Sequence, residues 1–236
     1  MCTVSFVKTG DKVIVTSNRD ERVIRLSALY PQQYAVNNKN VMYPKDPLAG
    51  GTWYVVDEKG TILVLLNGAH EEHQISPPYR KSRGLIVLDM IGSNSPIAFW
   101  KAIDLDDIEP FTLVLYQDKM LYQLRWDGQN KDTLVLDTDK SHIWSSATLY
   151  PAVVRAKREV LFQSFLCKKD TISEKELFQF HRYTEPEDLR SGLVININNE
   201  LKTLSITQTV LEADQLKLTY YDLIKEEEYN SSFVLI

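Results

Sequence analysis

The chain has 236 residues, 44% of them hydrophobic and 25% charged, which is enough apolar material for one large buried core. Its formal net charge is -5 and no basic stripe stands out, which argues against a nucleic-acid-binding protein. There is no signal peptide, no apolar run long enough to span a membrane and no disulfide framework, so we expect a single domain over residues 1–236 in a reducing, cytoplasmic compartment.

The first predicted element is a β-hairpin that begins at Cys2. Two alternating apolar runs flank a turn at Gly10, and the second run ends in the Asn-Arg-Asp-Glu sequence of residues 18–21. Antiparallel pairing outward from this turn puts Cys2 opposite Arg19 or Asn18. The hairpin thus brings a thiol near the start of the chain to a polar cluster, which is our candidate active site.

Cys2 has the features of a nucleophile if it becomes the first residue of the mature chain. Removal of Met1, which we expect, would give Cys2 a free α-amino group. The reference pKa is about 7.7 to 8.0 for that amine and about 8.5 for a Cys thiol, so the amine can act as general base for the thiol. Arg19 could lower the thiol pKa, and Asp20 could accept a hydrogen bond from the ammonium group. The alternative is that Cys2 only begins a buried strand.

Residues 23–47 contain several turn signals and little periodicity, which predicts a long loop over the surface. This loop either forms one wall of a substrate pocket or is an irregular connection without a role. Gly50 and Gly51 then precede a predicted strand at residues 52–56, which contains Trp53. The glycine pair either supplies a turn or lets the backbone pass close to a ligand.

The next predicted strand, at residues 61–67, ends at Asn67. Its side-chain amide could hold the oxyanion of a tetrahedral intermediate, a contribution of about 3 kcal/mol. The alternative is a turn Asn that caps the strand end. His70 and His73 follow without a partner set at a metal-ligand spacing, so we expect a solvated loop there and neither a metal nor a cofactor.

The rest of the chain alternates between helical and strand patterns. Helices are predicted at residues 79–91, 95–104, 151–167 and 173–180. Strands are predicted at residues 111–117, 120–126, 134–136, 142–146, 193–197, 203–210 and 216–222, with a last edge strand at residues 233–236. The first two helices should cover one face of a sheet.

Three side chains in the second half carry specific expectations. The helix at residues 151–167 is expected to bury a face that includes Val153 and Val160. Cys167, at its end, is expected to be a buried or half-buried thiol without a chemical role. His181, at the end of the next helix, is interpreted as a partner of the helix dipole rather than a catalyst.

Several segments together resemble the NRDE protein family, also called the transport-and-Golgi-organisation family. They are MCTVSF at the start, the tetrad at residues 18–21, LAGGTWYVV, and LLNGAHEEH followed by KSRGLIVLDMI. The motifs cover about the first 90 residues in the family's order, and the second half matches loosely. The resemblance implies an α+β fold of the N-terminal nucleophile hydrolase type. This is a four-layer αββα sandwich of two antiparallel sheets, similar in active-site plan to penicillin V acylase and bile salt hydrolase.

The resemblance also implies roles for residues late in the chain. Ser146 stands where family members carry an Asn that, in the related acylases, helps to form the oxyanion hole. Either the Ser146 hydroxyl substitutes as a donor, or the protein has weak or no hydrolase activity. Arg190 resembles an Arg that lies near the nucleophile in the acylase group. We assign Asn18, Gly51 and Trp53 to substrate binding.

The sequence therefore predicts an N-terminal cysteine hydrolase that acts on a non-peptide C–N amide bond in a small-molecule amide or acyl-type ligand. Arg19 and Asp20 would organise the Cys2 nucleophile, and Asn67 and Ser146 would hold the oxyanion. The rival hypothesis is a binding or transport protein for haem, acyl or lipid-like ligands that has kept the fold and lost the chemistry. A thiol-dependent redox protein is a third option, which the lack of a second nearby Cys disfavours. An acidic protein of mixed sheets is also compatible with a homodimer.

Overall fold

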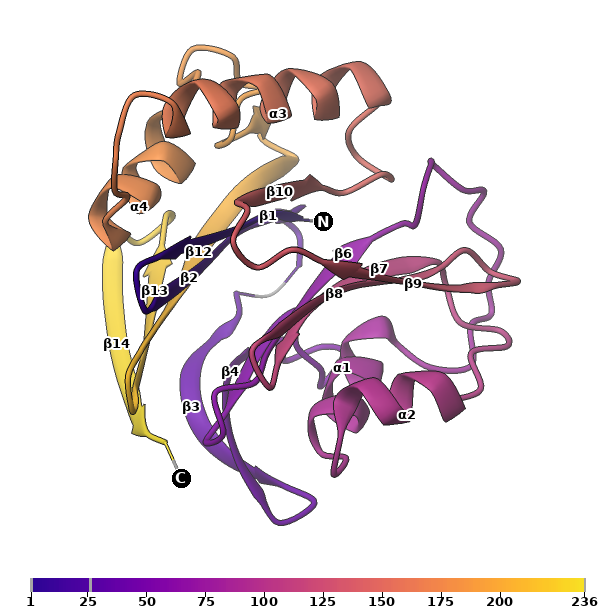
Figure 1. Ribbon diagram of the computed structural model, residues 1–236. Helices are drawn as coiled ribbons and strands as arrows, with labels where there is room; N and C mark the ends of the chain where they lie inside the picture. The colour runs from indigo at the N-terminus through magenta and orange to yellow at the C-terminus, as the bar shows by residue number, and fades with distance from the viewer. Residues whose placement is uncertain (1, 26, 236) are drawn as a thin grey trace.

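The computed structural model describes residues 2–25 and 27–235, and the side chain of Cys2 lies outside that description (Figure 1). Within these residues the strands form two seven-stranded antiparallel sheets. The first sheet has the order β10-β1-β2-β12-β13-β14, with β11 paired to β12. Its strands are β1 (Cys2–Thr9), β2 (Lys12–Arg22), β10 (His142–Ser145), β11 (Asn196–Ile197), β12 (Leu201–Glu212), β13 (Gln215–Asp222) and β14 (Glu227–Val234).

The second sheet follows chain order from β3 to β9. Its strands are β3 (Leu29–Val36), β4 (Lys39–Lys45), β5 (Tyr54–Asp57), β6 (Ile62–Asn67), β7 (Phe111–Gln117), β8 (Met120–Trp126) and β9 (Lys131–Leu136). The helices α1 (Arg83–Ile91) and α2 (Pro96–Ala102) pack against this sheet. The helices α3 (Ala152–Leu166) and α4 (Glu174–Tyr183) lie on the far side of the first sheet (Figure 1). The four-layer αββα sandwich is therefore confirmed.

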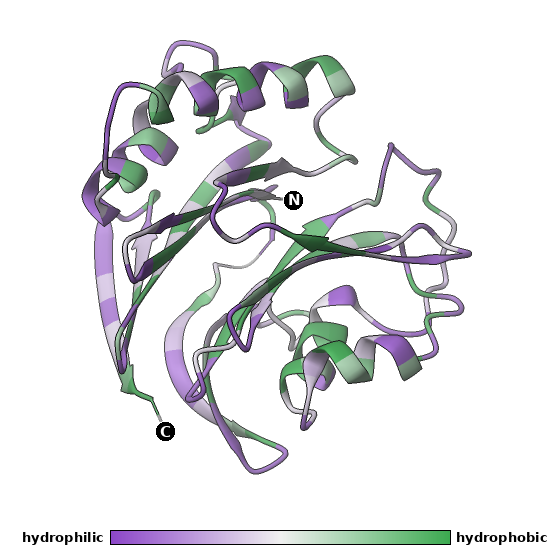
Figure 2. Cartoon of the chain, in the orientation of Figure 1, coloured by the Kyte–Doolittle hydropathy of each residue, from purple (hydrophilic) through white to green (hydrophobic). Residues whose placement is uncertain are grey.

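The first sheet contributes to two hydrophobic cores, because alternate residues of a strand face opposite sides of the sheet. In β1, Val4 and Phe6 join the large cluster between the sheets, whereas Val7 packs with Phe162 in a smaller cluster under α3 and α4. Figure 2 shows the hydrophobic residues along α1 and the inner strands. The hydroxyl of Tyr54 also donates to the carbonyl of Val15, at 3.1 Å, which ties the second sheet to the first.

The first hairpin has the predicted register. Its turn lies at Gly10, whose φ of 58° is in the left-handed region that favours glycine. The ladder runs outward from there until Cys2 pairs with Arg19. The predicted pairing of these two residues is therefore confirmed at the level of the backbone.

Residues 23–47 are not a long loop, contrary to the prediction. They contain the hairpin of β3 and β4, and its turn is formed by Asn37 and Asn38, with φ values of 48° and 63°. Asn tolerates this left-handed conformation, which is the one that tight hairpin turns require. Tyr34 and Tyr43 stack across the two strands with ring centroids 4.3 Å apart. The turn signal at Asn37 and Asn38 was therefore correct, whereas the prolines at positions 31 and 44, which also suggested turns, lie inside β3 and β4.

The buried face of α3 also differs from the prediction. The helix buries Arg158 and Phe162, while Val153 and Val160 are 75% and 65% exposed. The apolar pattern was misleading because a charged residue occupies the centre of the buried face. Cys167 is exposed rather than buried, since it follows the last turn of the helix.

One strand prediction also needed correction. The predicted strand at residues 193–197 is reduced to β11, and the predicted strand at residues 142–146 is β10, which pairs with β1 in the first sheet although it follows β9 in the chain.

His181 locks α4 onto the first sheet. The Asn18 amide nitrogen donates to the carbonyls of His181 and Leu193, at 3.0 and 2.6 Å, so its oxygen faces the His181 ring. Nδ1 of His181 therefore donates to Asn18 Oδ1 at 2.6 Å, and Nε2 accepts from the Ser5 hydroxyl at 2.7 Å. Burial, aided by the charge of Arg158, lowers the pKa of His181 from 6.5 to about 3. A neutral ring cannot serve as a charged dipole partner, so that interpretation of His181 is wrong.

The neutral His181 predicts a loss of stability at acid pH. Because its pKa is lower in the folded chain, the unfolded chain takes up the extra proton as the pH falls below 6.5. The free energy of unfolding should therefore fall toward acid pH, by up to about 1.4 kcal/mol per pH unit from this group. Urea unfolding at pH 7, 6 and 5 measures that slope, which His181→Gln should reduce and the exposed control His70→Gln should not. An equal slope in His181→Gln would contradict the assignment.

Candidate active site

Arg19 is held in one position at the end of β2. Only 4% of it is exposed, and its guanidinium carbon lies 4.3 Å from the centroid of the Trp53 ring. Its Nη2 is 3.6 Å from carboxylate oxygens of both Glu21 and Asp46. A buried cation needs such partners, because its desolvation is costly. Arg19 is thus a fixed positive charge next to the paired position of Cys2.

A small pocket of about 90 Å³ opens beside Arg19. It brings together four of the residues singled out in the sequence, namely Arg19, Gly51, Trp53 and Asn67. Both ends of the segment at residues 23–47 reach it as well, through Arg25 and Asp46. This segment therefore contributes to a pocket wall, although it forms a hairpin and not a loop.

Gly51 allows two backbone segments to meet at the pocket edge. A Cβ atom at this position would overlap the backbone of Gly84, at the start of α1. The N–H of Thr52 donates to the Gly84 carbonyl at 3.2 Å. Gly50 adopts a φ of 73°, so the pair supplies both a turn and a close approach. Gly51 thus lies close to the backbone of Gly84 rather than to a ligand, and both glycines line the pocket.

Asn67 and Ser146 are neighbours in the structure. The Ser146 hydroxyl, in a residue that is 1% exposed, donates to the main-chain carbonyl of Asn67 at 2.8 Å. Because a hydroxyl has a single proton, this contact occupies the donor of Ser146. The Asn67 side-chain amide lines the pocket and makes no hydrogen bond to any other residue that the structure describes. It is therefore an unengaged donor at the end of β6.

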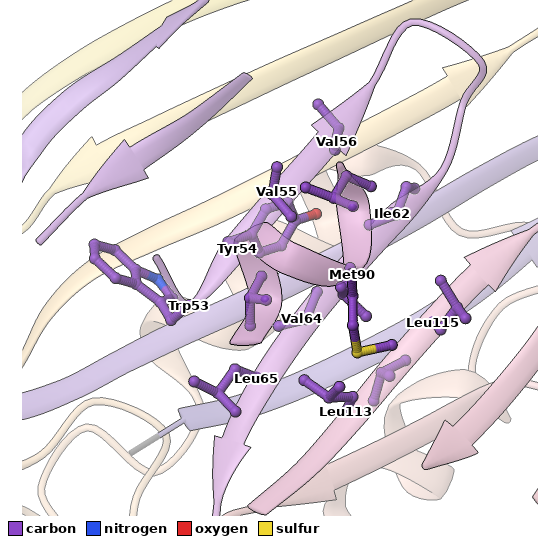
Figure 3. Packing of buried hydrophobic residues seen from close by; sticks show 14 of the residues in the cluster. Trp53, Tyr54, Val55, Val56, Ile62, Val64, Leu65, Met90, Leu113 and Leu115 are labelled. Atoms are coloured by element: carbon purple, nitrogen blue, oxygen red, sulfur yellow. The ribbon is translucent and has the colours of Figure 1, made fainter. Parts of the chain in front are cut away.

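Trp53 provides a second unengaged donor. The residue is 6% exposed, and its Nε1 is buried without a hydrogen-bond partner among the described residues. Figure 3 shows Trp53 beside Tyr54 at the edge of the buried cluster. The Leu65 N–H donates to the Trp53 carbonyl at 2.8 Å, which fixes β5 against β6. A buried N–H without a partner is costly, and Trp53 lines the pocket, so this donor is left free for an acceptor that reaches it.

Asp20 lies among hydroxyl donors rather than in the pocket. Its two carboxylate oxygens accept from Thr203 Oγ1 and from the Tyr150 hydroxyl, each at 2.6 Å. Burial raises the pKa of Asp20 above its usual 3.8, while the charge of Arg158 and the two hydroxyls oppose the rise. Asn18 is similarly engaged, because its amide is used by His181 and Leu193. The tetrad at residues 18–21 thus divides between two faces of the sheet.

Arg158 is a buried group that the sequence did not single out. Its guanidinium lies 3.6 Å from the centroid of the Tyr150 ring and donates to Thr3 Oγ1 at 2.6 Å. It also donates to the carbonyls of Ser191, at 3.1 Å, and Gly192. The side chain of Arg190 itself is exposed. The segment that follows it contacts the first hairpin indirectly, because the carbonyls of Ser191 and Gly192 bind Arg158, which in turn binds Thr3. The sequence does contain one sign that Arg158 is buried. It lies four residues before Phe162 in α3, so the two side chains share the buried face of the helix.

The His70 and His73 segment shows no metal arrangement. His73 Nε2 is 3.3 Å from Glu109, and His70 Nδ1 is 3.3 Å from Arg125 Nη1. Among the described side chains, no group of three His, Cys, Asp or Glu residues is placed to hold an ion. Nor does the described part of the chain contain a helix with the length and apolar character needed to cross a membrane.

Solved structures of two enzymes have the same fold. The Caenorhabditis elegans orthologue of N-acylethanolamine-hydrolyzing acid amidase aligns with a TM-score of 0.62 and 10% identity, over 88% of this chain and 92% of that one. A mutant of conjugated bile acid hydrolase from Clostridium perfringens aligns with a TM-score of 0.55 and 12% identity, over 98% and 96%. A second variant of that hydrolase gives 0.54 and 10%, over 98% and 92%. The fold is therefore that of the N-terminal nucleophile hydrolases.

Comparison by sequence gives a family but no individual relative. The search of curated proteins finds no match. The family model described as Transport and Golgi organisation 2 matches residues 1–231, nearly the whole length. This confirms the resemblance seen in the sequence motifs, and the chain belongs to the Transport and Golgi organisation 2 family.

Proposed function

We propose that the protein is an N-terminal cysteine hydrolase that cleaves a non-peptide C–N amide bond in a small molecule after removal of Met1. The observation that carries the proposal is the pocket beside Arg19. Its lining includes Asn67 and Trp53, and neither the Asn67 amide nor the Trp53 indole N–H has a hydrogen-bond partner in the described chain. An acyl-transfer oxyanion requires N–H donors of this kind. The fold, shared with an acid amidase and a conjugated bile acid hydrolase, supports a hydrolytic reaction of this class.

The nucleophile in this proposal is the thiol of Cys2. Cys2 pairs in register with Arg19, and paired residues on antiparallel strands have side chains on the same face of the sheet. The proposal therefore puts the thiol on the Arg19 face, where the fixed guanidinium charge favours the thiolate. The α-amino group of Cys2 takes the thiol proton, as its reference pKa near neutrality allows.

The reaction has two halves. The thiolate attacks the amide carbonyl carbon, a C–S bond forms, and the carbonyl electron pair moves to oxygen, where Asn67 and Trp53 donate hydrogen bonds. The ammonium group returns its proton to the amide nitrogen, the C–N bond breaks and the amine leaves. Water, deprotonated by the α-amine, then attacks the thioester, which releases a carboxylic acid and restores the thiol.

Ser146 acts in this scheme as a positioning residue. Its hydroxyl holds the Asn67 main chain, and its proton is not free for the substrate. Its departure from the Asn of the related acylases is then compatible with catalysis, because the Trp53 indole supplies a second donor. Asp20 and Arg158 stabilise the strand ends from the opposite face.

A binding or transport protein for haem, acyl or lipid-like ligands is the second candidate. The engaged Ser146 hydroxyl favours it, since the oxyanion hole of the related acylases is incomplete at this position. Stoichiometric binding of haem or a fatty acid, followed by absorbance and native mass spectrometry, separates the two. Binding that is equally tight in Cys2→Ala, without turnover of any amide by the wild type, would favour this candidate.

Replacing the nucleophile should abolish hydrolysis. We expect Cys2→Ala to reduce amide turnover to the rate without enzyme, because the acyl intermediate in this proposal forms on the Cys2 thiol. The measurement is product formation over a panel of N-acyl amides, by mass spectrometry. Cys167→Ala is the matched control, since it removes the exposed second thiol and should keep full activity. A Cys2→Ala protein as fast as the wild type would exclude this mechanism.

Removing an oxyanion donor should lower kcat more than it changes KM. Asn67→Ala is expected to reduce kcat by about 10²- to 10³-fold, and Trp53→Phe, which keeps the ring under Arg19, should also reduce it. Steady-state kinetics on the best substrate of the panel measure both constants. Asn230→Ala, on β14, is the control that should leave them unchanged. If Asn67→Ala raised KM alone, Asn67 would be a binding residue and not an oxyanion donor.

A further inference from the structure

A second cavity, of about 370 Å³, lies next to the contact between Asn67 and Ser146. Gly68 and Ala147, the neighbours of these two residues, line it. Its other walls come from β10, α3 and the strands β7 and β8, and Figure 1 shows β10 running between α3 and these strands. The volume falls in the range of about 300–1,000 Å³ that is typical of small-molecule sites.

Two arginines from different layers face this cavity. Arg125 comes from β8 and Arg155 from α3, and both are half-buried. The Nε atom of each is buried and has no hydrogen-bond partner among the described residues. Neither guanidinium forms an ion pair with a described Asp or Glu side chain, and the contact of Arg125 with His70 Nδ1 is to a ring nitrogen. Two buried donors of the same charge are therefore left without an acceptor.

Two carboxylates lie near this pair, but neither forms an ion pair with it among the described side chains. Burial lowers the pKa of Arg125, the charge of Asp132 opposes this, and the nearby charge of Arg155 adds to it. Asp132 lies opposite Arg125 in the β8–β9 ladder, and Glu159 lines the cavity, yet both are exposed. Like charges held together in a partly desolvated place are unfavourable unless an anion joins them. The two guanidinium groups that line the cavity are therefore suited to hold an anion between them.

The remaining walls define the rest of the ligand. Leu66, Leu136, Ile143 and Trp144 add apolar surface. The Trp144 indole is fixed by donation to Gln123 Oε1 at 2.9 Å, so its position is set before a ligand arrives. Bidentate guanidinium groups suit carboxylate and phosphate oxygens. The cavity is larger than an inorganic anion alone would need. A ligand with an apolar part attached to its carboxylate or phosphate would fill it.

We propose that this cavity binds a small organic anion, with its carboxylate or phosphate between Arg125 and Arg155 and its apolar part against Trp144. The site goes beyond the proposed hydrolase chemistry, because none of the described residues that line it takes part in that reaction. A Cys2→Ala background therefore tests it separately from catalysis.

Calorimetric titration of Cys2→Ala protein tests the site. The probes are hexanoate for a carboxylate, butyl phosphate for an organic phosphate, inorganic phosphate for the bare anion, and hexanamide as the neutral match of hexanoate. We expect one equivalent of an organic anion to bind, at least roughly tenfold more tightly than hexanamide. Arg125→Gln and Arg155→Gln should each weaken it by a similar factor, while the exposed Arg80→Gln should not.

The ligand-free variants provide a second readout. Because either substitution removes one of two like charges, the thermal midpoint of Arg155→Gln without ligand should equal or exceed that of the parent. If the substitutions prevent folding, the comparison of hexanoate with hexanamide on the parent still decides. Equal binding of these two probes, no binding of either organic anion at millimolar concentration, or full binding by both Arg variants would overturn the proposal.

Discussion

The antiparallel pairing of β1 with β2 is the constraint on which the rest of the site depends. It fixes Cys2 opposite Arg19 and sends successive residues of β2 to opposite faces of the first sheet. Arg19 lies at the pocket with Trp53, whereas Asn18 and Asp20 meet partners from the other side. A slip of one residue would exchange these faces, so the register determines which groups can act on a ligand.

The opposite face explains why the register is held so firmly. His181 links Asn18 to Ser5 through hydrogen bonds at its two ring nitrogens, and Asp20 accepts from Tyr150 and Thr203. These contacts join both strands of the hairpin to α4, to the chain before α3 and to β12. Buried polar groups that are fully satisfied favour one arrangement over its neighbours, because every alternative leaves some of them unpaired. Within the tetrad at residues 18–21, Arg19 therefore lies at the pocket, while Asn18 and Asp20 make the contacts that hold it in position.

Local patterns predicted much of the fold and part of the site. The alternation of apolar residues predicted the bounds of β7 and β8, and the turn at Gly10 predicted the pairing of Cys2 with Arg19. These features could be predicted because each depends on residues that are close together in the sequence. The hairpin of β3 and β4 was missed because Pro31 and Pro44 lie within its strands, and a proline inside a run of residues argues against a strand. Arg158 and Tyr150 were missed because their contacts join distant segments, which no local period encodes. Arg19, Gly51, Trp53 and Asn67 do line one pocket, yet the free indole N–H and the engaged Ser146 hydroxyl needed coordinates.

The central claim is that Cys2 is an activated N-terminal nucleophile. The most direct test is the intact mass of untagged protein before and after brief alkylation at neutral pH, with peptide mapping of the adduct. Cys167 is an exposed internal thiol, so it reports how fast an ordinary cysteine reacts. We predict a mass without Met1 and one rapid adduct on Cys2, formed before Cys167 reacts. A retained Met1, or a Cys2 that reacts no faster than Cys167, would contradict the account.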